Sequence, residues 1–246
     1  MRRRSLAARG LLALALLVLS ACGGSTGSGQ SGGELGTVNM RILGDYPCLD
    51  PYGKNCGGLI TQEIFDTMYD HLVDIGPGGK LVPYLATSWT TTPTSVTFKL
   101  RNDVTCSDGT KLTPTAIANS VNSFFIRGKA EGTNLVGDWG PGPYNAKGDD
   151  AAGTMTFTLG TPYPTAVYRF AIFQIVCPSG IAPASSPVDP LAIFDSASQG
   201  SGPYTMVSAT HGQQIVLKLR PEWKWGPSGI TAATLPKQLI LKEVTN

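Results

Sequence analysis

The chain has 246 residues, of which 41% are hydrophobic and 15% charged, and its formal net charge is +2. This composition is typical of a compact globular protein and excludes a disordered tail. Nucleic-acid binding needs a basic face, and no cluster of basic residues remains after the arginines at positions 2–4, so no nucleic-acid partner is expected.

The first 21 residues have the layout of a cleavable secretory signal. Arg2, Arg3 and Arg4 form a cationic start, residues 11–19 are apolar, and small residues lead up to Cys22. A membrane-spanning helix is the alternative, but it needs about 20 apolar residues, and this run is much shorter. We therefore expect residues 1–21 to be removed from the mature protein.

The end of this signal, Leu19-Ser20-Ala21-Cys22, resembles the bacterial lipobox, in which the cysteine becomes the first mature residue and carries lipid. Acyl chains contribute about 0.8 kcal/mol per buried methylene, so several chains together hold a protein durably at a bilayer. Residues 22–36 are mostly Gly and Ser and are expected to form a flexible tether. The sequence thus predicts a lipoprotein anchored through Cys22 to the extracytoplasmic face of the cell membrane.

Four cysteines follow the lipidation site: Cys48, Cys56, Cys106 and Cys177. In an exported protein they suggest two disulfides, for which three connectivities are possible. We favour Cys48–Cys56, which closes a short loop, together with Cys106–Cys177, which is worth on the order of 3–4 kcal/mol in the chain-entropy model. Free buried thiols are the alternative.

In the first half of the chain, hydrophobic periodicity and turn residues predict alternating strands and helices. The expected elements are, in chain order, a strand over 37–43, an amphipathic helix over 59–73, a turn at 76–79, a strand over 96–100 and a helix capped by Thr113 with Pro114 at its first position. This helix presents an apolar face that includes Phe124 and Phe125.

The second half alternates in the same way, without a strict strand–helix–strand repeat. The expected elements are a long loop over 127–153, a strand over 154–159, a buried helix over 166–176, a second long loop over 178–200, a hairpin of strands 204–208 and 214–220, and a last strand over 239–244. The fold class is mixed α/β.

Five segments match, in order, the motifs of one protein family. They are Phe65–Leu72 (FDTMYDHL), Gly79–Trp89 (GKLVPYLATSW), Val96–Thr113, Gly200–Tyr204 (GSGPY) and Arg220–Gly226 (RPEWKWG). The second is close to the family's "gKlvPdLAesW" and the fourth to its "GtGPY". From about Thr37 to Val244, the chain therefore resembles solute-binding protein family 5, the oligopeptide and dipeptide receptors of ABC importers.

The resemblance implies a periplasmic-binding-protein-like α/β fold of class II. It places an incomplete, discontinuous lobe I at residues 37–71 and 179–246, and an inserted second lobe at 72–178. Family members are considerably longer and have a third lobe, so we expect this chain to be truncated before that lobe. Cys106 and Cys177 replace the family's usual aromatic and aliphatic residues, which supports their pairing.

Members of this family hold a peptide or another small solute in a cleft between lobes that close over it, and they deliver it to a permease. The resemblance implies a monomer whose partners are the solute, the permease and ATPase subunits, and the membrane. Because the third lobe would supply one wall of the cleft, we expect weak or no binding by this chain alone. Peptides are the family's commonest cargo, and relatives also carry sugars and chelated metals.

Three candidate ligand contacts lie in the first half of the chain. Tyr46 and Asn55 belong to the loop over residues 46–56, which corresponds to a family stretch that approaches the ligand; a solvated turn is the alternative. Asn119 occupies a helix position where some relatives carry a ligand-facing Tyr, and a plain surface residue is the alternative.

Three further candidates follow. Trp139 either lines the cleft or caps the core. Ser201 and Tyr204, in the Gly-Ser-Gly-Pro-Tyr turn, are candidates as well, and the alternative is a structural turn whose glycines adopt positive φ.

An enzyme is not expected, and neither is a cofactor or a bound metal. His71 and His211 are the only histidines, and neither has the spaced partners of a zinc site. Gly23–Gly27 matches the Gly-x-Ser-x-Gly nucleophile motif but lies in the tether, without the strand and helix that this motif requires. A surface lipoprotein that holds a partner without transport is the second hypothesis, and a hydrolase is the third.

Overall fold

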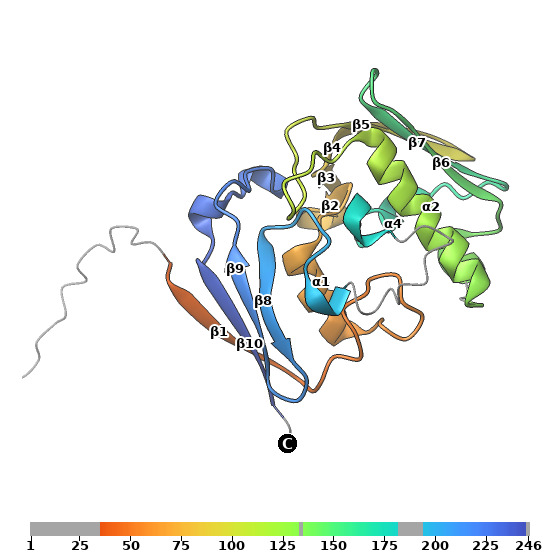
Figure 1. Cartoon of the computed structure of the whole chain (residues 1–246). Helices are drawn as coiled ribbons and strands as arrows, with labels where there is room; N and C mark the ends of the chain where they lie inside the picture. Colours follow the sequence, from red (N-terminus) through yellow and green to blue (C-terminus); the bar gives the residue numbers. More distant parts are fainter. Residues whose placement is uncertain (1–34, 133–134, 182–193, 245–246) are drawn as a thin grey trace, which may run out of the picture. The chain divides into compact units, whose positions relative to one another are not determined.

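The computed structural model describes residues 35–132, 135–181 and 194–244. Most of the described strands belong to two four-stranded sheets, with the orders β1-β10-β9-β8 and β4-β5-β7-β6, and β2 and β3 form a small separate pair (Figure 1). The predicted signal, the lipidation site Cys22 and most of the tether lie outside the described residues.

The first sheet joins the two ends of the described chain. It consists of β1 (Thr37–Ile42), β10 (Gln238–Glu243), β9 (Gln214–Leu219) and β8 (Tyr204–Thr210), and β1 runs parallel to β10 while the other pairs are antiparallel. In β9 and β10 buried residues alternate with more exposed ones: Ile215 and Leu217 are buried in β9, and Leu239 and Leu241 are buried in β10. This is the alternation expected of a sheet with one face on the core.

The second sheet is antiparallel and is covered by a long helix. Its strands are β4 (Ala86–Thr92), β5 (Ser95–Leu100), β7 (Thr154–Leu159) and β6 (Tyr144–Asp149). Helix α2 (Pro114–Ala130) packs against β6 and β7. It begins as predicted, because the Thr113 side chain accepts a hydrogen bond from the Ala116 amide and Pro114 has no amide hydrogen that needs a partner.

Shorter elements fill the space around the two sheets. They are α1 (Leu59–Met68), which packs against β8, β2 (Val73–Ile75), β3 (Leu81–Pro83), α3 (Leu135–Trp139), α4 (Ala166–Arg169) and the 3₁₀ turns η1 (Pro77–Gly79), η2 (Pro178–Gly180), η3 (Pro227–Gly229) and η4 (Ala232–Thr234).

Three predicted elements are wrong in extent. The helix expected over 59–73 ends at Met68, since Val73 already belongs to β2. The helix expected over 166–176 is a single turn, because the apolar segment after it makes backbone hydrogen bonds to other parts of the chain, such as the Ile175 amide to the Asp70 carbonyl. The expected loop over 127–153 contains the end of α2, all of α3 and strand β6.

Both favoured disulfides are present. Cys48–Cys56 joins Cα atoms 5.1 Å apart, and Cys106–Cys177 joins Cα atoms 6.1 Å apart. The strands of the first sheet all come from the segments assigned to lobe I, and those of the second sheet come from residues 72–178. The lobe boundaries themselves stay a prediction.

Candidate functional site

The carboxyl ends of β1 and β10 lie side by side, because these two strands are parallel neighbours (Figure 1). Immediately beyond them the Val244 amide donates to the Ile42 carbonyl at 3.1 Å, and the Glu243 amide donates to Gln213 in the β8–β9 turn at 2.9 Å. In open α/β sheets, ligands bind in the crevice outside the carboxyl ends of strands. This edge of the first sheet is therefore the candidate site.

A hydrogen bond and an aromatic stack occupy this edge. The Asp45 carboxylate lies 3.0 Å from the His211 Nδ1 atom, and the buried Tyr46 ring stacks on the His211 ring with centroids 4.3 Å apart. Burial raises the pKa of Tyr46 to about 12, so the phenol stays neutral at physiological pH. The loop after β1 is thereby attached to the β8–β9 turn.

Glu243 contributes a second carboxylate next to Asp45. Both of its carboxylate oxygens are shielded from solvent, and the Asp45 side chain and the Gly212 backbone lie next to them. Burial, and then the neighbouring Asp45, raises the pKa of Glu243. Burial tends to raise the pKa of Asp45, but the hydrogen bond with His211 acts in the opposite direction, and the pKa of Asp45 is lowered. Two neighbouring carboxylates of this kind favour a proton or a positively charged group beside them.

A groove of about 560 Å³ opens beside this cluster. Two of its leucines are unusually exposed, Leu43 at 78% and Leu59 at 87%. The groove combines apolar walls with charged groups of both signs, which suits a small solute with an apolar part and an amine. Its lining residues are Arg41, Leu43, Asp45, Pro47, Gly57, Gly58, Leu59, Ile60, Thr61 and Glu63.

The loop that borders this groove is held from behind by buried polar contacts. Asp50 is fully buried and pairs with Arg127 of α2 at 2.6 Å. The Tyr52 hydroxyl contacts the Ser120 hydroxyl at 2.6 Å and donates to the Gln174 carbonyl at 2.8 Å. Together with the Cys48–Cys56 disulfide, these contacts give the loop a fixed backbone.

A buried carboxylate lies deeper in the molecule. Asp70 accepts hydrogen bonds from Tyr84 at 2.5 Å, Ser201 at 2.8 Å and Trp225 Nε1 at 2.6 Å, and a longer one from Trp223 Nε1 at 3.4 Å. Burial, followed by the Asp70 charge, raises the pKa of Tyr84 well above its ordinary value, so this hydroxyl remains a donor. Asp70 therefore joins segments that are distant in the sequence.

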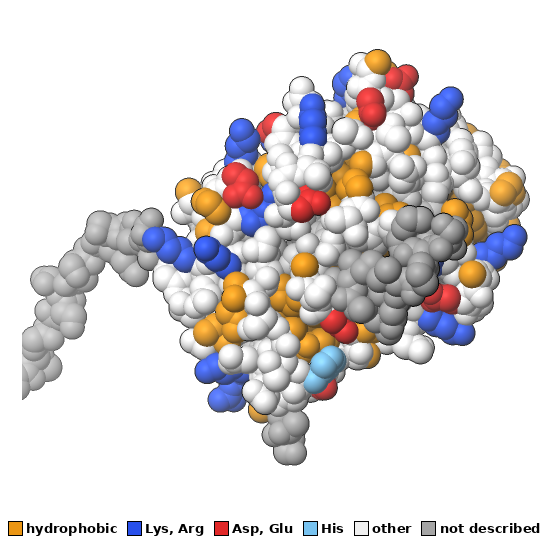
Figure 2. Space-filling view, viewed as in Figure 1, with side chains coloured by type: hydrophobic (Ala, Val, Ile, Leu, Met, Phe, Trp, Pro, Cys, Tyr) orange, Lys and Arg blue, Asp and Glu red, His pale blue; other side chains and the backbone are white. Residues whose placement is uncertain are grey.

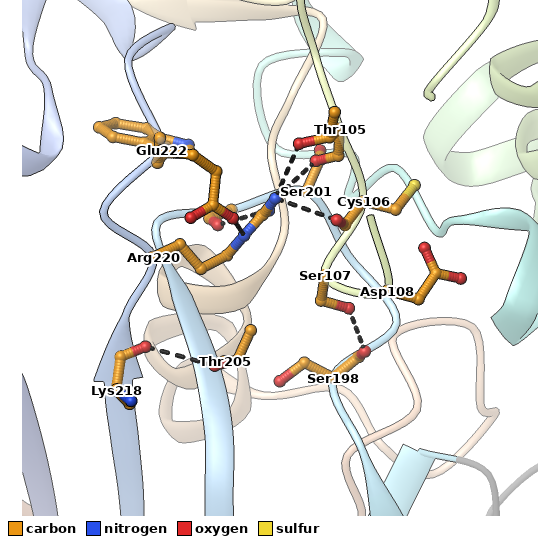
Figure 3. A network of polar contacts seen from close by, with 12 residues as sticks. Thr105, Cys106, Ser107, Asp108, Ser198, Ser201, Thr205, Lys218, Arg220 and Glu222 are labelled. Carbon is orange, nitrogen blue, oxygen red and sulfur yellow. Dashed lines mark hydrogen bonds and ion pairs between the residues drawn. The ribbon is translucent and has the colours of Figure 1, made fainter. Parts of the chain in front are cut away.

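Arg220 makes a similar connection at the end of β9 (Figure 3). Its guanidinium donates to the Thr105 and Cys106 carbonyls at 2.9 and 3.0 Å, to the Gly202 carbonyl at 3.2 Å, and to Glu222 at 2.8 Å. Nearby, the Ser107 hydroxyl donates to the Ser198 carbonyl at 2.6 Å. Because these partners are internal, Asp70 and Arg220 have structural roles.

The structure places four of the six candidate contacts inside the protein. Trp139 is 4% exposed and packs edge-on against Phe157 and Phe170, as a core residue does. The Ser201 hydroxyl is used by Asp70, and the Tyr204 hydroxyl donates to the Pro236 carbonyl at 2.9 Å. The fourth is Tyr46, whose ring stacks on His211.

Asn55 and Asn119 are the two candidates on the surface. Asn55 lies in the loop closed by the Cys48–Cys56 disulfide, and Asn119 lies on α2. Sequence reasoning did not select Asp45 or Glu243 as contacts. The available signal was their position at the carboxyl ends of two predicted strands, Asp45 just beyond the strand over 37–43 and Glu243 within the strand over 239–244.

The glycines of the Gly-Ser-Gly-Pro-Tyr turn correct one expectation. Gly200 and Gly202 do not have positive φ. They lie so close to the backbone of Met68 that a Cβ atom at either position would collide with it. Their role is close packing of the turn against the end of α1.

A larger groove, of about 730 Å³, lies elsewhere, between α2, α3 and the start of β6. Its walls are mainly apolar, and Lys129 is the one charged residue among its lining residues. In the described part of the chain, no group of His, Cys, Asp or Glu is arranged to hold a metal ion. None of the described helices has the length and apolar character needed to cross a membrane.

Comparison with known protein families gives one match. The model described as "Bacterial extracellular solute-binding proteins, family 5 Middle" matches residues 80–242. None of the curated proteins matches the chain.

Several solved structures have the same fold. A substrate-binding protein from Microbacterium hydrocarbonoxydans, complexed with 4-hydroxybenzoate hydrazide, is 29% identical with a TM-score of 0.71, over 85% of this chain and 42% of that one. CtaP from Listeria monocytogenes is 21% identical with a TM-score of 0.70, and the match covers 87% of this chain and 41% of CtaP. NikA from Brucella suis, in complex with Fe(III)-EDTA, is 20% identical with a TM-score of 0.66, and the match covers 85% of this chain and 40% of NikA.

This chain therefore spans about two fifths of the length of these structures. The matches confirm the mixed α/β, periplasmic-binding-protein-like fold that the sequence predicts, for a part of such a protein.

Proposed function

Because the chain belongs to the bacterial extracellular solute-binding proteins of family 5, we propose that it helps to recognise a solute for an ABC importer on the extracytoplasmic side of the membrane. Members of this family bind small solutes, act with ABC permeases and are not enzymes. The importing activity of the whole protein, its solute and its permease and ATPase partners are part of this proposal.

We place one wall of the solute site at the carboxyl ends of β1 and β10. The observation that carries this proposal is the pair of neighbouring carboxylates, Asp45 and Glu243, of which Asp45 lines the groove. Two carboxylates side by side favour a positively charged group next to them, and an ammonium group of a ligand would supply it. The leucines of the adjacent groove would contact the apolar part of the solute.

A peptide or a similar small amine-bearing solute fits this arrangement. The relative from Microbacterium hydrocarbonoxydans is complexed with 4-hydroxybenzoate hydrazide, which is likewise a small solute with an apolar part. We propose further that the protein is a monomer held at the membrane by lipid on Cys22. Since only one wall of the cleft is assigned to this chain, we expect its affinity for solute to be weak.

Thermal unfolding with millimolar solute tests the proposal. A ligand that binds the folded state alone raises Tm, even at low affinity, once its concentration exceeds Kd. We expect a dipeptide with a free amino group to raise Tm, and its N-acetylated form to have a smaller effect. Glu243→Gln should abolish the difference, whereas the control Asp138→Asn, at an exposed ion pair distant in the chain, should retain it. Equal Tm shifts for both peptides would contradict an amine site at Glu243.

A further inference from the structure

A second groove, of about 400 Å³, lies at the opposite end of the first sheet, where β1 begins and β9 ends. Its apolar residues include Leu35, which is 52% exposed, and Leu219. Two exposed lysines, Lys218 and Lys237, also line it. Figure 2 shows Lys and Arg side chains close to the start of β1.

The chain enters the described fold through this groove. The Lys237 amide donates to the Leu35 carbonyl at 2.9 Å, which attaches Leu35 to the start of β10. Only 13 residues separate Cys22 from Leu35 (35 − 22 = 13), and even a fully extended chain of this length spans at most about 45 Å. A lipid on Cys22 would therefore keep this groove, more than any other part of the described fold, close to the bilayer.

We propose that this groove docks on the anionic phospholipid headgroups of the membrane that holds the anchor, an inference that rests on the lipidation of Cys22 in the proposed function. Leu35 and Leu219 would contact the interfacial region, and Lys218 would contact phosphates. A lysine near an anionic surface is worth about 1 kcal/mol. An attraction of this size is weak for a protein that is free in solution, but a short covalent link to the membrane raises the effective concentration of the surface.

The charges around the groove agree with an anionic partner. Glu222, which follows the lining residue Pro221, is paired with Arg220 at 2.8 Å, so its charge is compensated within the protein. Docking at this end also leaves the solute groove free. Strand β1 has 6 residues, and at about 3.3 Å per residue its carboxyl end lies roughly 20 Å from its start.

The test uses the full chain, made in bacterial cells with labelled palmitate and reconstituted into vesicles of phosphatidylcholine with or without phosphatidylglycerol. The rate of lysine acetylation is then measured by mass spectrometry. We expect Lys218 and Lys237 to react several-fold more slowly in vesicles that contain phosphatidylglycerol, and we expect high salt to remove this protection. Lys147, exposed on β6 of the other sheet, should react equally in both vesicles.

A charge-reversed variant, Lys218→Glu, should remove the protection of Lys237, and the control Lys147→Glu should not. Unchanged rates at Lys218 and Lys237 of a palmitate-labelled chain would overturn the docking surface while leaving the anchor in place. Protection that follows protein concentration rather than lipid charge would assign the groove to a second copy and would also overturn it. If the chain carries no palmitate label, Cys22 is not lipidated, and the docking inference fails together with the proposed anchor. The comparison of the two kinds of vesicle with the native chain is enough to decide between these outcomes, so failure of a variant to fold would not affect the result.

Discussion

Asp70 is a buried carboxylate whose four donors, Tyr84, Ser201, Trp223 and Trp225, come from three separate segments. Buried polar groups stabilise a fold when every partner is present and are costly when one is lost. Asp70 therefore acts as a structural centre for the packing of distant segments.

Asp70→Asn should lower the free energy of unfolding by roughly 1.5–3 kcal/mol, because an amide has one acceptor oxygen instead of two and carries no charge. Chemical denaturation measures this change. The control is Asp138→Asn, whose carboxylate is 64% exposed in an ion pair with Arg169, and its effect should be small. Similar losses for the two variants would show that Asp70 has no special role.

Glu243 predicts a pH dependence. Burial and Asp45 raise its pKa in the folded state, so its favourable contribution is present below the ordinary value of 4.5 and is lost as pH rises through the folded-state pKa. Glu243→Gln should therefore be more stable than the native chain at pH 7, by about 0.2–1 kcal/mol, the size usual for partly exposed charges. Unfolding curves from pH 4 to 8 should show the two proteins converging at the acidic end. A difference that grows toward acidic pH would contradict the assigned shift.

At the scale of elements, the contact between the turn at 200–204 and the end of α1 depends on glycine. A Cβ atom on Gly202 would meet the Met68 backbone, which has no room to move away. Gly202→Ala should thus cost roughly 1–3 kcal/mol, the usual penalty of overpacking.

Gly57 provides the matched control for this substitution. A Cβ atom there would have no heavy atom within 4 Å, and its backbone does not require positive φ. Gly57→Ala should therefore be nearly neutral in the same denaturation experiment. If both alanine variants unfold at the same denaturant concentration, the close approach to Met68 is not important for stability.

Elements with local signals were predictable from the sequence. β5 and β7 alternate apolar and polar residues, and the start of α2 has both its N-cap and its proline. Strand β4 was missed because most of its residues are exposed on both faces, which leaves no alternation to detect. The sequence predicted α4 to be longer than it is, because a buried apolar run has the same composition whether it is helical or extended.

At the scale of the whole molecule, the family and the fold were predictable because each family motif between Phe65 and Gly226 is an unbroken stretch of sequence. The buried polar contacts were not, since Asp70 and its partner Trp225 are 155 residues apart. The candidate site was predictable only in part. The loop over residues 46–56 borders the groove, but the pairing of Asp45 with His211, 166 residues away, depends on the parallel contact of β1 with β10.

The central claim is that solute is bound at the carboxyl ends of β1 and β10, and a nuclear magnetic resonance titration tests it most directly. A free dipeptide is added to the labelled chain up to millimolar concentration while the backbone amide shifts are followed. We predict weak binding, with Kd of roughly 1 mM, and shifts confined to residues 43–63, the turn around His211 and Glu243. Shifts concentrated in the groove between α2 and α3, or no shifts at all, would contradict the account.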